Sequence, residues 1–219
     1  MRYGVLGTGN VGRVLAGRLV EVGHEVRMGS RTADNEAAAA WAADAGPSAS
    51  HGTFADAAEF GQTVMNCTAG GVSLDALAAA GAENLSGKVL IDVANALTFE
   101  TGRLTLTVCN TDSLGEQIQR AFPDARVVKT GNTIGNQVMI HPERVPGRHA
   151  VFVSGDDAEA KQHVAGMLES FGWPPESVVD LGGIETARGT EMYLVLWFEM
   201  MQAGGERRFN IDVVKAGQS

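Results

Sequence analysis

RYGVLGTGNVGRVLAGRLVEVGHEVRMGSR, residues 2–31, is the stretch of sequence that decides the fold. It opens with an apolar run at residues 2–6, which predicts a β-strand. A glycine-rich turn follows, and then a helical pattern whose apolar residues share one face: Val11, Leu15, Leu19 and Val22. Gly23 ends that helix, and residues 24–28 predict a second strand. The stretch therefore predicts a strand, a tight turn, a helix and a second strand.

The turn carries the motif G-x-G-x-x-G, formed by Gly7, Gly9 and Gly12. In a Rossmann dinucleotide-binding unit the first glycine allows the tight turn, the second leaves room for a pyrophosphate, and the third lets the helix pack closely on the sheet. Backbone N–H groups at the start of the helix then face the phosphates. The alternative is a turn with a purely structural role. The position of the motif between a strand and a helix favours dinucleotide binding.

The end of the second strand distinguishes between the two nicotinamide cofactors. A free ribose 2′-hydroxyl is usually bound by Asp or Glu at this point, whereas this chain has Ser30 and Arg31. A hydroxyl and a guanidinium hold a 2′-phosphate by charge-assisted hydrogen bonds, and a carboxylate would repel it. We therefore predict NADP(H). The alternative leaves Arg31 as a solvated loop charge, with Asp34 reaching the ribose.

The composition excludes several classes of protein. The 219 residues carry a formal net charge of -9 without a basic cluster, so nucleic-acid binding is not expected. Cys67 and Cys109 lie far apart, and neither they nor the scattered histidines have metal-ligand spacing, so no metal site is expected. The chain shows no signal peptide, and its most apolar segment, residues 192–198, is too short to span a membrane. We expect a cytoplasmic protein that binds no membrane.

The rest of the chain alternates strand and helix patterns, as is typical of a parallel sheet covered by helices. Further strands are expected at residues 48–52, 62–68, 88–93, 125–130, 150–153 and 177–180. We therefore predict a Rossmann-type, doubly wound α/β fold with a mostly parallel sheet. Residues 1–148 are expected to form the NADP-binding domain. Residues 149–219 are expected to form a small α/β extension that packs on it and contributes to an acceptor site and a dimer interface.

Three later loops are expected at the rim that holds the glycine turn, because the carboxyl ends of parallel strands meet at one edge of the sheet. Small or polar residues in these loops leave room for a ligand and for hydrogen bonds to it. The loops contain Thr68, Ala69 and Gly70; Asn95 and Ala96; and Asn132 and Thr133. Residues 98–111 look irregular and are a candidate for a loop over the site.

The final helix, expected at residues 184–202, is apolar nearly all round from Met192 to Met201, with Glu199 as its main interruption. A helix of that kind must be buried. In a chain of this size the burial is expected against a second subunit. We therefore predict a homodimer.

Several short segments along essentially the whole chain carry a family resemblance. They are residues 7–12, 23–26, 29–31, 128–133, 154–157, 181–183, 187–188 and 191. Together they resemble the NADP oxidoreductases of the coenzyme F420-dependent type. The motifs up to Arg31 are shared with many dinucleotide binders, and the later ones are more specific. The resemblance implies a small single-domain Rossmann protein that passes a hydride between NADP(H) and a deazaflavin.

The resemblance also implies roles for individual residues. Ser30 and Arg31 hold the 2′-phosphate, and the loop after Thr68 and the turn at Asn95 and Ala96 flank the nicotinamide. The residues that line the pyrophosphate are Thr8, Asn10 and Val11.

The chain departs from the family pattern at Asn132. Deazaflavin reductases have a histidine at this position, whereas the Asn132-Thr133 pair is similar to the cytosolic domain of the membrane metalloreductases of the STEAP type. The acceptor is therefore left open between coenzyme F420, FMN or FAD, and a ferric complex.

Hydride transfer between planar rings needs the rings stacked and little acid–base help. Asn132 and Thr133 are predicted to donate hydrogen bonds to an acceptor carbonyl as charge develops on it, and Arg188 to add positive charge. The alternative for Asn132 is a turn residue between glycines. The alternative for Arg188 is an ion pair with Glu191 at the start of the last helix.

Three functions follow from these observations. The first is an NADPH-dependent reductase of a planar acceptor, preferably coenzyme F420 and otherwise a flavin or a ferric complex. The second is a dehydrogenase of a small hydroxy acid or imine, which would add a large helical domain; only residues 184–219 follow the last strand, which argues against it. The third is a non-catalytic NADPH sensor that binds a protein partner through residues 192–201.

Overall fold

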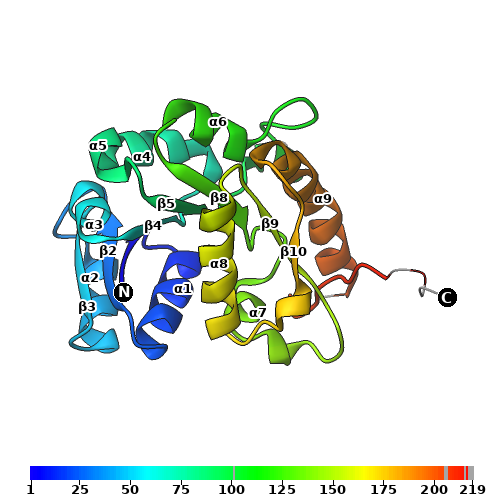
Figure 1. Cartoon of the computed structure of the whole chain (residues 1–219), viewed down its shortest axis with the longest axis horizontal. Helices are drawn as coiled ribbons and strands as arrows, with labels where there is room; N and C mark the ends of the chain where they lie inside the picture. The colour runs from blue at the N-terminus through cyan, green and yellow to red at the C-terminus, as the bar shows by residue number, and fades with distance from the viewer. Residues whose placement is uncertain (101, 205–206, 215, 217–219) are drawn as a thin grey trace.

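The computed structural model describes residues 1–100, 102–204, 207–214 and 216. One eight-stranded sheet forms the centre of the molecule (Figure 1). Its strands are β1 (Arg2–Leu6), β2 (Glu25–Ser30), β3 (Ala49–Thr53), β4 (Thr63–Asn66), β5 (Val89–Asp92), β8 (Arg126–Thr130), β9 (Val151–Ser154) and β10 (Val178–Asp180). A separate antiparallel pair consists of β6 (Leu97–Thr98) and β7 (Thr105–Leu106).

The order of strands in the sheet is β10-β9-β8-β5-β4-β1-β2-β3. The six strands from β3 to β8 all run parallel in the order of a Rossmann sheet, with the reversal of strand order between β1 and β4. The predicted doubly wound, mostly parallel α/β fold is confirmed. Ligands of such sheets bind at the carboxyl ends of the strands, next to that reversal.

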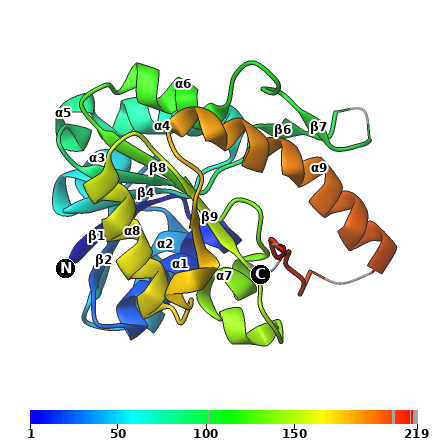
Figure 2. The ribbon, with the colours of Figure 1, turned by 45° about the vertical axis from the view of Figure 1, so that its right-hand side comes forward.

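Helices cover both faces of the sheet (Figures 1 and 2). One face carries α1 (Asn10–Glu21), α2 (Glu36–Ala45), α7 (Asn136–Ile140) and α8 (Ala158–Ser170). The other carries α3 (Phe54–Phe60), α4 (Ser73–Ala80), α5 (Ala82–Leu85), α6 (Leu114–Ala121) and the start of α9 (Ala187–Gly204). None of the helices in the described part of the chain has the length and apolar character needed to cross a membrane.

The helix starts follow from capping residues. Thr53 and Asp56 form a capping box at the start of α3, in which each side chain accepts from the backbone N–H of the other residue. Ser113 caps α6 and Asp157 caps α8. These residues fix where the three helices begin.

The expected loop at residues 98–111 is only partly irregular, because it contains β7 and the second residue of β6. The sequence also gives no prediction for α5 and α7. The strands β6 and β7 have two residues each, α5 has four residues and α7 has five. Elements of that length are too short to show a hydrophobic period.

Residues 149–219 contribute two strands to the same sheet. β9 pairs antiparallel with β8, and β10 pairs parallel with β9. The expected extension is thus continuous with the sheet of residues 1–148, and its boundary at residue 148 stays a prediction.

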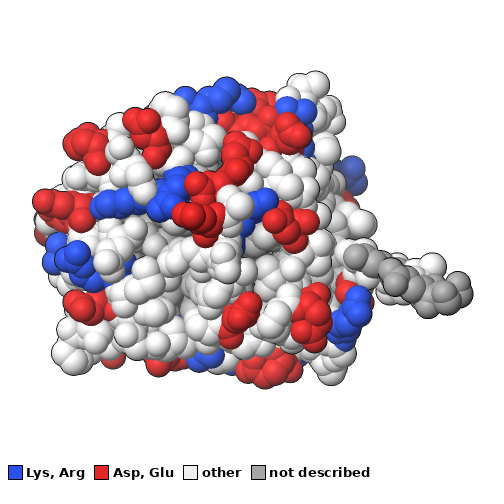
Figure 3. Space-filling view, in the orientation of Figure 1, with Lys and Arg blue, Asp and Glu red and all other residues white. Residues whose placement is uncertain are grey.

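On the face seen in Figure 3, Lys and Arg side chains are interspersed with Asp and Glu.

Helix α9 is buried on only one side in the single chain, so the expected burial against a second subunit stays a prediction. Glu191 and Leu194 face the protein, whereas Met192, Val195 and Leu196 are 37%, 39% and 55% exposed. Figure 2 shows why: the helix starts beside α6 and then extends away from the sheet. Met192, Val195 and Leu196 therefore present apolar side chains to solvent near the middle of the helix.

We propose that a homodimer covers this face. An exposed apolar patch of this kind is typical of a protein interface. Leu196→Glu is expected to give monomers in light scattering at micromolar concentration, because the new charge would be buried in the interface. Leu74→Glu is the control, since Leu74 is an exposed apolar residue on α4. A monomeric wild-type protein under the same conditions would contradict the proposal.

Candidate functional site

In the glycine turn between β1 and α1, two positions require glycine and the third has open space beside it. Gly7 has a positive φ of 116°, which favours glycine, and a β-carbon at Gly12 would lie 2.2 Å from the Gly7 carbonyl oxygen. A β-carbon at Gly9 would meet nothing within 4 Å. Gly9 is the N-cap of α1 and gives the first turn no side-chain cap. The turn thus leaves both the space and the uncapped backbone N–H groups that a pyrophosphate needs.

Ser30 and Arg31 lie at the carboxyl end of β2, but they differ in their availability. Ser30 is the last residue of the strand, is buried, and donates its hydroxyl hydrogen to the carbonyl oxygen of Thr32. Arg31 is exposed and forms no ion pair with the residues that the structure describes. The guanidinium is therefore free to meet an anion, whereas the Ser30 hydroxyl now shapes the turn.

Two adjoining cavities run along the carboxyl ends of β4, β5 and β8, and we refer to them together as the rim cleft. The first is about 230 Å³ and the second about 300 Å³. They share Val11, Val93 and Asn95. The first is further lined by Cys67, Thr68, Ala69, Gly70, Ala94 and Leu97. The second is further lined by Asn10, Asn132, Ile134, Gly135, Asn136, Met139, Leu194, Trp197 and Arg207.

The structure brings most of the predicted rim residues together in this cleft. Gly70 links two of the predicted loops, because a β-carbon there would lie 2.2 Å from the Asn95 carbonyl oxygen. Ala96 is buried and does not line either cavity. The glycine turn contributes Asn10 and Val11 to the lining of the cleft.

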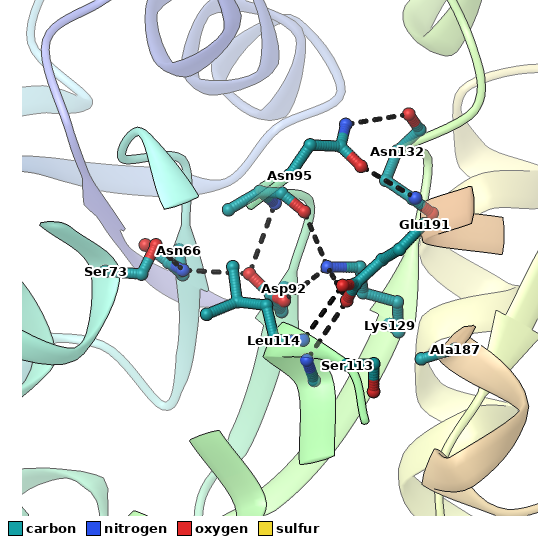
Figure 4. A network of polar contacts seen from close by, with 12 residues as sticks. Asn66, Ser73, Asp92, Asn95, Ser113, Leu114, Lys129, Asn132, Ala187 and Glu191 are labelled. Carbon is teal, nitrogen blue, oxygen red and sulfur yellow. Dashed lines mark hydrogen bonds and ion pairs between the residues drawn. The ribbon is translucent and has the colours of Figure 1, made fainter. Parts of the chain in front are cut away.

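Asn95 and Asn132 hold two of these loops to one another (Figure 4). The side-chain amide of Asn95 donates to the backbone carbonyl of Asn132 at 3.0 Å, and that of Asn132 donates to Oδ1 of Asn95 at 3.0 Å. Each NH₂ group has a second hydrogen that neither of these bonds uses. The pair is therefore both a clamp between β5 and β8 and a source of hydrogen-bond donors at the cleft.

Thr133 lies apart from the rim cleft although it is next to Asn132 in sequence. It lines a different, apolar cavity of about 230 Å³, together with Phe152 and Tyr193. The two residues therefore do not form the joint donor group at the cleft that the sequence suggests. Both residues lie in the turn between β8 and α7, and this turn directs their side chains to different cavities.

A buried network of charges lies directly beneath the rim cleft (Figure 4). Nζ of Lys129 is 2.8 Å from Oδ2 of Asp92 and 2.8 Å from Oε1 of Glu191. The three side chains are 1%, 0% and 2% exposed. Lys129 also donates to the carbonyl oxygen of Ala94, which lines the cleft beside Asn95. Burial alone would lower the pKa of Lys129, but the two carboxylates outweigh it and raise the pKa, so the ammonium stays charged.

Backbone donors balance the extra negative charge of this network. Glu191 accepts hydrogen bonds from the N–H groups of Leu114 at 2.8 Å and Gly115 at 3.1 Å, at the start of α6. The positive end of a helix dipole stabilises a carboxylate there. Asp92 accepts from Nδ2 of Asn66 at 2.8 Å and from the N–H of Ala94 at 3.2 Å. Both carboxylates are thus satisfied without water.

Sheet register explains how these side chains meet. Asn66 pairs with Asp92 across β4 and β5, and Asp92 pairs with Lys129 across β5 and β8. Paired residues of neighbouring strands point to the same face. Sequence reasoning did not assign this network, although a charged residue in each of two apolar strands was a signal for it.

Arg188 is placed away from the rim cleft. Its guanidinium makes two hydrogen bonds to the carboxylate of Glu116 on α6, and it does not line either cavity. The hydrogen bond from Arg188 holds the pKa of Glu116 below its usual range. The expected alternative, an ion pair between Arg188 and Glu191, is wrong, because Glu191 faces Lys129 instead.

Lys129→Met is expected to lower the free energy of unfolding by about 3–5 kcal/mol, because it leaves two buried carboxylates without their cation. Urea unfolding followed by circular dichroism measures the loss. Lys161→Met is the matched control: Lys161 pairs with Asp180, which is 55% exposed, so the expected loss is at most about 1 kcal/mol. Equal losses in the two variants would show that the buried network adds nothing special.

Comparisons with known proteins agree with this geometry. Residues 2–96 match the family model described as NADP oxidoreductase, coenzyme F420-dependent. The metalloreductase STEAP3 of Rattus norvegicus is 32% identical over 190 residues, which are 87% of this chain and 36% of the rat protein. The chain therefore spans about a third of the length of that curated relative.

Solved structures show the same fold. The crystal structure of a candidate F420-dependent NADP reductase from Arthrobacter sp. FB24 has a TM-score of 0.91 and 47% identity, and covers 98% of this chain and 99% of that one. A reductive aminase from Aspergillus terreus, solved in complex with NADPH and ethyl-5-oxohexanoate, has a TM-score of 0.65 and 19% identity. The match covers 93% of this chain and 62% of the aminase, and at that identity it shows the fold alone.

Proposed function

Since the chain belongs to the family of NADP oxidoreductases described as coenzyme F420-dependent, we propose that it transfers a hydride between NADPH and a planar acceptor, coenzyme F420 or a flavin. The observation that supports this most is the continuity of the rim cleft. It runs from Val11, beside the glycine turn, past Asn95 and Asn132 to α9. One end of a dinucleotide and a second ring can lie side by side in a cleft of that shape.

The residues around the glycine turn fit a phosphorylated dinucleotide. Gly9 leaves the space that the pyrophosphate needs, and the uncapped start of α1 supplies N–H donors. The exposed guanidinium of Arg31 binds the 2′-phosphate, and Ser30 adds a hydrogen bond when its hydroxyl turns from Thr32. The nicotinamide lies between the loop after β4 and the turn at Asn95. When bound, NADPH supplies the hydride and leaves as NADP⁺, and the reduced ring takes one proton from water.

The protein contributes position and polarity. Apolar side chains of Val11, Val93 and Ile134 line the cleft and exclude water from the facing rings. The second amide hydrogen of Asn132 is directed to a carbonyl of the acceptor, where negative charge increases during transfer. Hydride transfer needs no strong base, and neither lining of the cleft contains Asp, Glu or His.

A ferric or flavin reductase of the STEAP type is the second candidate. The match to the rat metalloreductase and the presence of Asn132 are the observations that support this candidate. A non-catalytic NADPH sensor is the third candidate. It would bind the cofactor, but no acceptor would oxidise the bound NADPH.

The decisive experiment follows the absorbance of NADPH and of NADH with coenzyme F420, FMN, FAD and ferric citrate as acceptors. We expect rapid oxidation of NADPH with a planar ring. Oxidation with ferric citrate alone would favour the metalloreductase activity. Tight binding of NADPH without oxidation by any acceptor would leave the sensor as the function.

Arg31→Ala is expected to raise the Kd for NADPH by roughly 10- to 100-fold, because a hydrogen bond to a charged group is worth about 1.5–3 kcal/mol. The Kd for NADH should not change, since NADH has no 2′-phosphate. Titration calorimetry with both cofactors measures this. Arg120→Ala, which removes an exposed arginine on α6, is the control and should change neither value. Equal affinity of the wild-type protein for the two cofactors would refute the assignment.

Asn132→Ala is expected to slow hydride transfer by roughly 10- to 100-fold in single-turnover kinetics, because a donor to the developing charge is lost. The Kd for NADPH should stay nearly the same. Thr133→Val is the neighbouring control, since Thr133 lines the separate cavity and its loss should leave the rate unchanged. An unaltered rate in Asn132→Ala would reduce Asn132 to a turn residue.

A further inference from the structure

We propose that Asn136, Trp197 and Arg207 form a subsite at the α9 end of the rim cleft, and that this subsite selects acceptors with an anionic arm. The inference rests on the proposed function, because it concerns the second ligand of the same cleft. All three residues line the second cavity, on the far side of Asn95 and Asn132 from the loop after β4.

The charge in this part of the cleft is of one sign. The whole chain has a formal net charge of -9, yet the linings of both cavities contain no Asp or Glu and one cation, Arg207. Arg207 is exposed and forms no ion pair within the described part of the chain. A carboxylate-free cleft with a free guanidinium favours an anion, and a guanidinium binds a phosphate with two parallel hydrogen bonds.

Two further donors in the same lining have no partner. Nε1 of Trp197 and Nδ2 of Asn136 are both buried and form no hydrogen bond with the residues that the structure describes. A buried donor without a partner costs about 1–3 kcal/mol. The subsite thus offers two N–H donors and a guanidinium, and none of these side-chain groups has an acceptor oxygen as its partner within the described residues. A ring with carbonyl oxygens and a phosphate-bearing arm supplies them.

The segment that carries Arg207 is fixed in place. A β-carbon at Gly135 would lie 2.5 Å from the Arg207 carbonyl oxygen, so the two backbones are in close contact. Phe209 stacks on Trp197 with ring centroids 5.4 Å apart. Further along, the carbonyl of Ile211 accepts from the N–H of Ala150 at 2.8 Å. The segment of Arg207 is therefore held beside the cleft by its contacts with Gly135, with Trp197 of α9 and with Ala150.

These donors fit one class of acceptor. The pyrimidine-dione edge of a flavin or deazaflavin ring presents carbonyl oxygens to Trp197 and Asn136, and a phosphate on the ribityl arm reaches Arg207. Riboflavin has the same ring as FMN but lacks the phosphate. The pair therefore separates the contribution of the arm from that of the ring.

The test compares FMN with riboflavin as acceptors of NADPH-derived hydride in the full-length protein. We expect Arg207→Ala to lower kcat/KM for FMN by roughly 10- to 100-fold. For riboflavin the value should stay within about two-fold of the wild type, because riboflavin has no phosphate for the guanidinium to bind. Arg207→Lys should keep part of the FMN activity. Arg120→Ala is the control and should change neither. Equal effects of Arg207→Ala on both acceptors, or no effect on either, would overturn the proposal.

A binding measurement keeps this test independent of catalysis. FMN should quench tryptophan fluorescence in the wild-type protein and in Trp41→Phe, because Trp41 lies on α2 and lines neither cavity of the rim cleft. The quench should be much smaller in Trp197→Phe. The quench should weaken in Arg207→Ala. If no acceptor oxidises NADPH but the quench depends on Trp197 and Arg207, the proposed function fails and the subsite stands. If FMN is reduced but neither the quench nor the rate changes in Trp197→Phe and Arg207→Ala, the subsite fails and the proposed function stands.

Discussion

The ion triad of Lys129, Asp92 and Glu191 is the constraint on which the site depends. Each partner is at most 2% exposed, and a charge at that depth is tolerated only when its partners are complete. Because the partners come from β8, β5 and α9, and Glu191 also caps α6, four elements must reach their places together. The lysine then holds the carbonyl of Ala94, one residue before Asn95.

This arrangement connects the floor of the rim cleft with its far wall. Asn95 is fixed from below through Ala94 and from the side through Asn132. Glu191 anchors the first turns of α9, and the same helix carries Leu194 and Trp197 into the second cavity. The end of the cleft that faces the acceptor is therefore positioned by a buried charge on the helix that also presents an apolar face to solvent.

Local signals in the sequence were enough to predict the fold, and most of the predicted rim residues do line one cleft, although their roles stay predictions. Gly7, Gly9 and Gly12 predicted the turn, and the alternation of strand and helix patterns predicted the strands of the sheet. The residues that failed did so for tertiary reasons. Thr133 points to another cavity, and Arg188 pairs with Glu116 rather than with its neighbour Glu191 on the helix. The triad joins β5, β8 and α9, and the proposed subsite joins Asn136 to Trp197 and Arg207. No local period shows which of these segments meet.

The account is tested most directly by a crystal structure of the protein with NADP⁺ bound. It predicts the pyrophosphate across Gly9, the 2′-phosphate within hydrogen-bond distance of Arg31, and the nicotinamide between Thr68 and Asn95 with its outer face open toward Trp197. A nucleotide bound elsewhere on the chain, or one whose 2′-phosphate points into solvent away from Arg31, would contradict it.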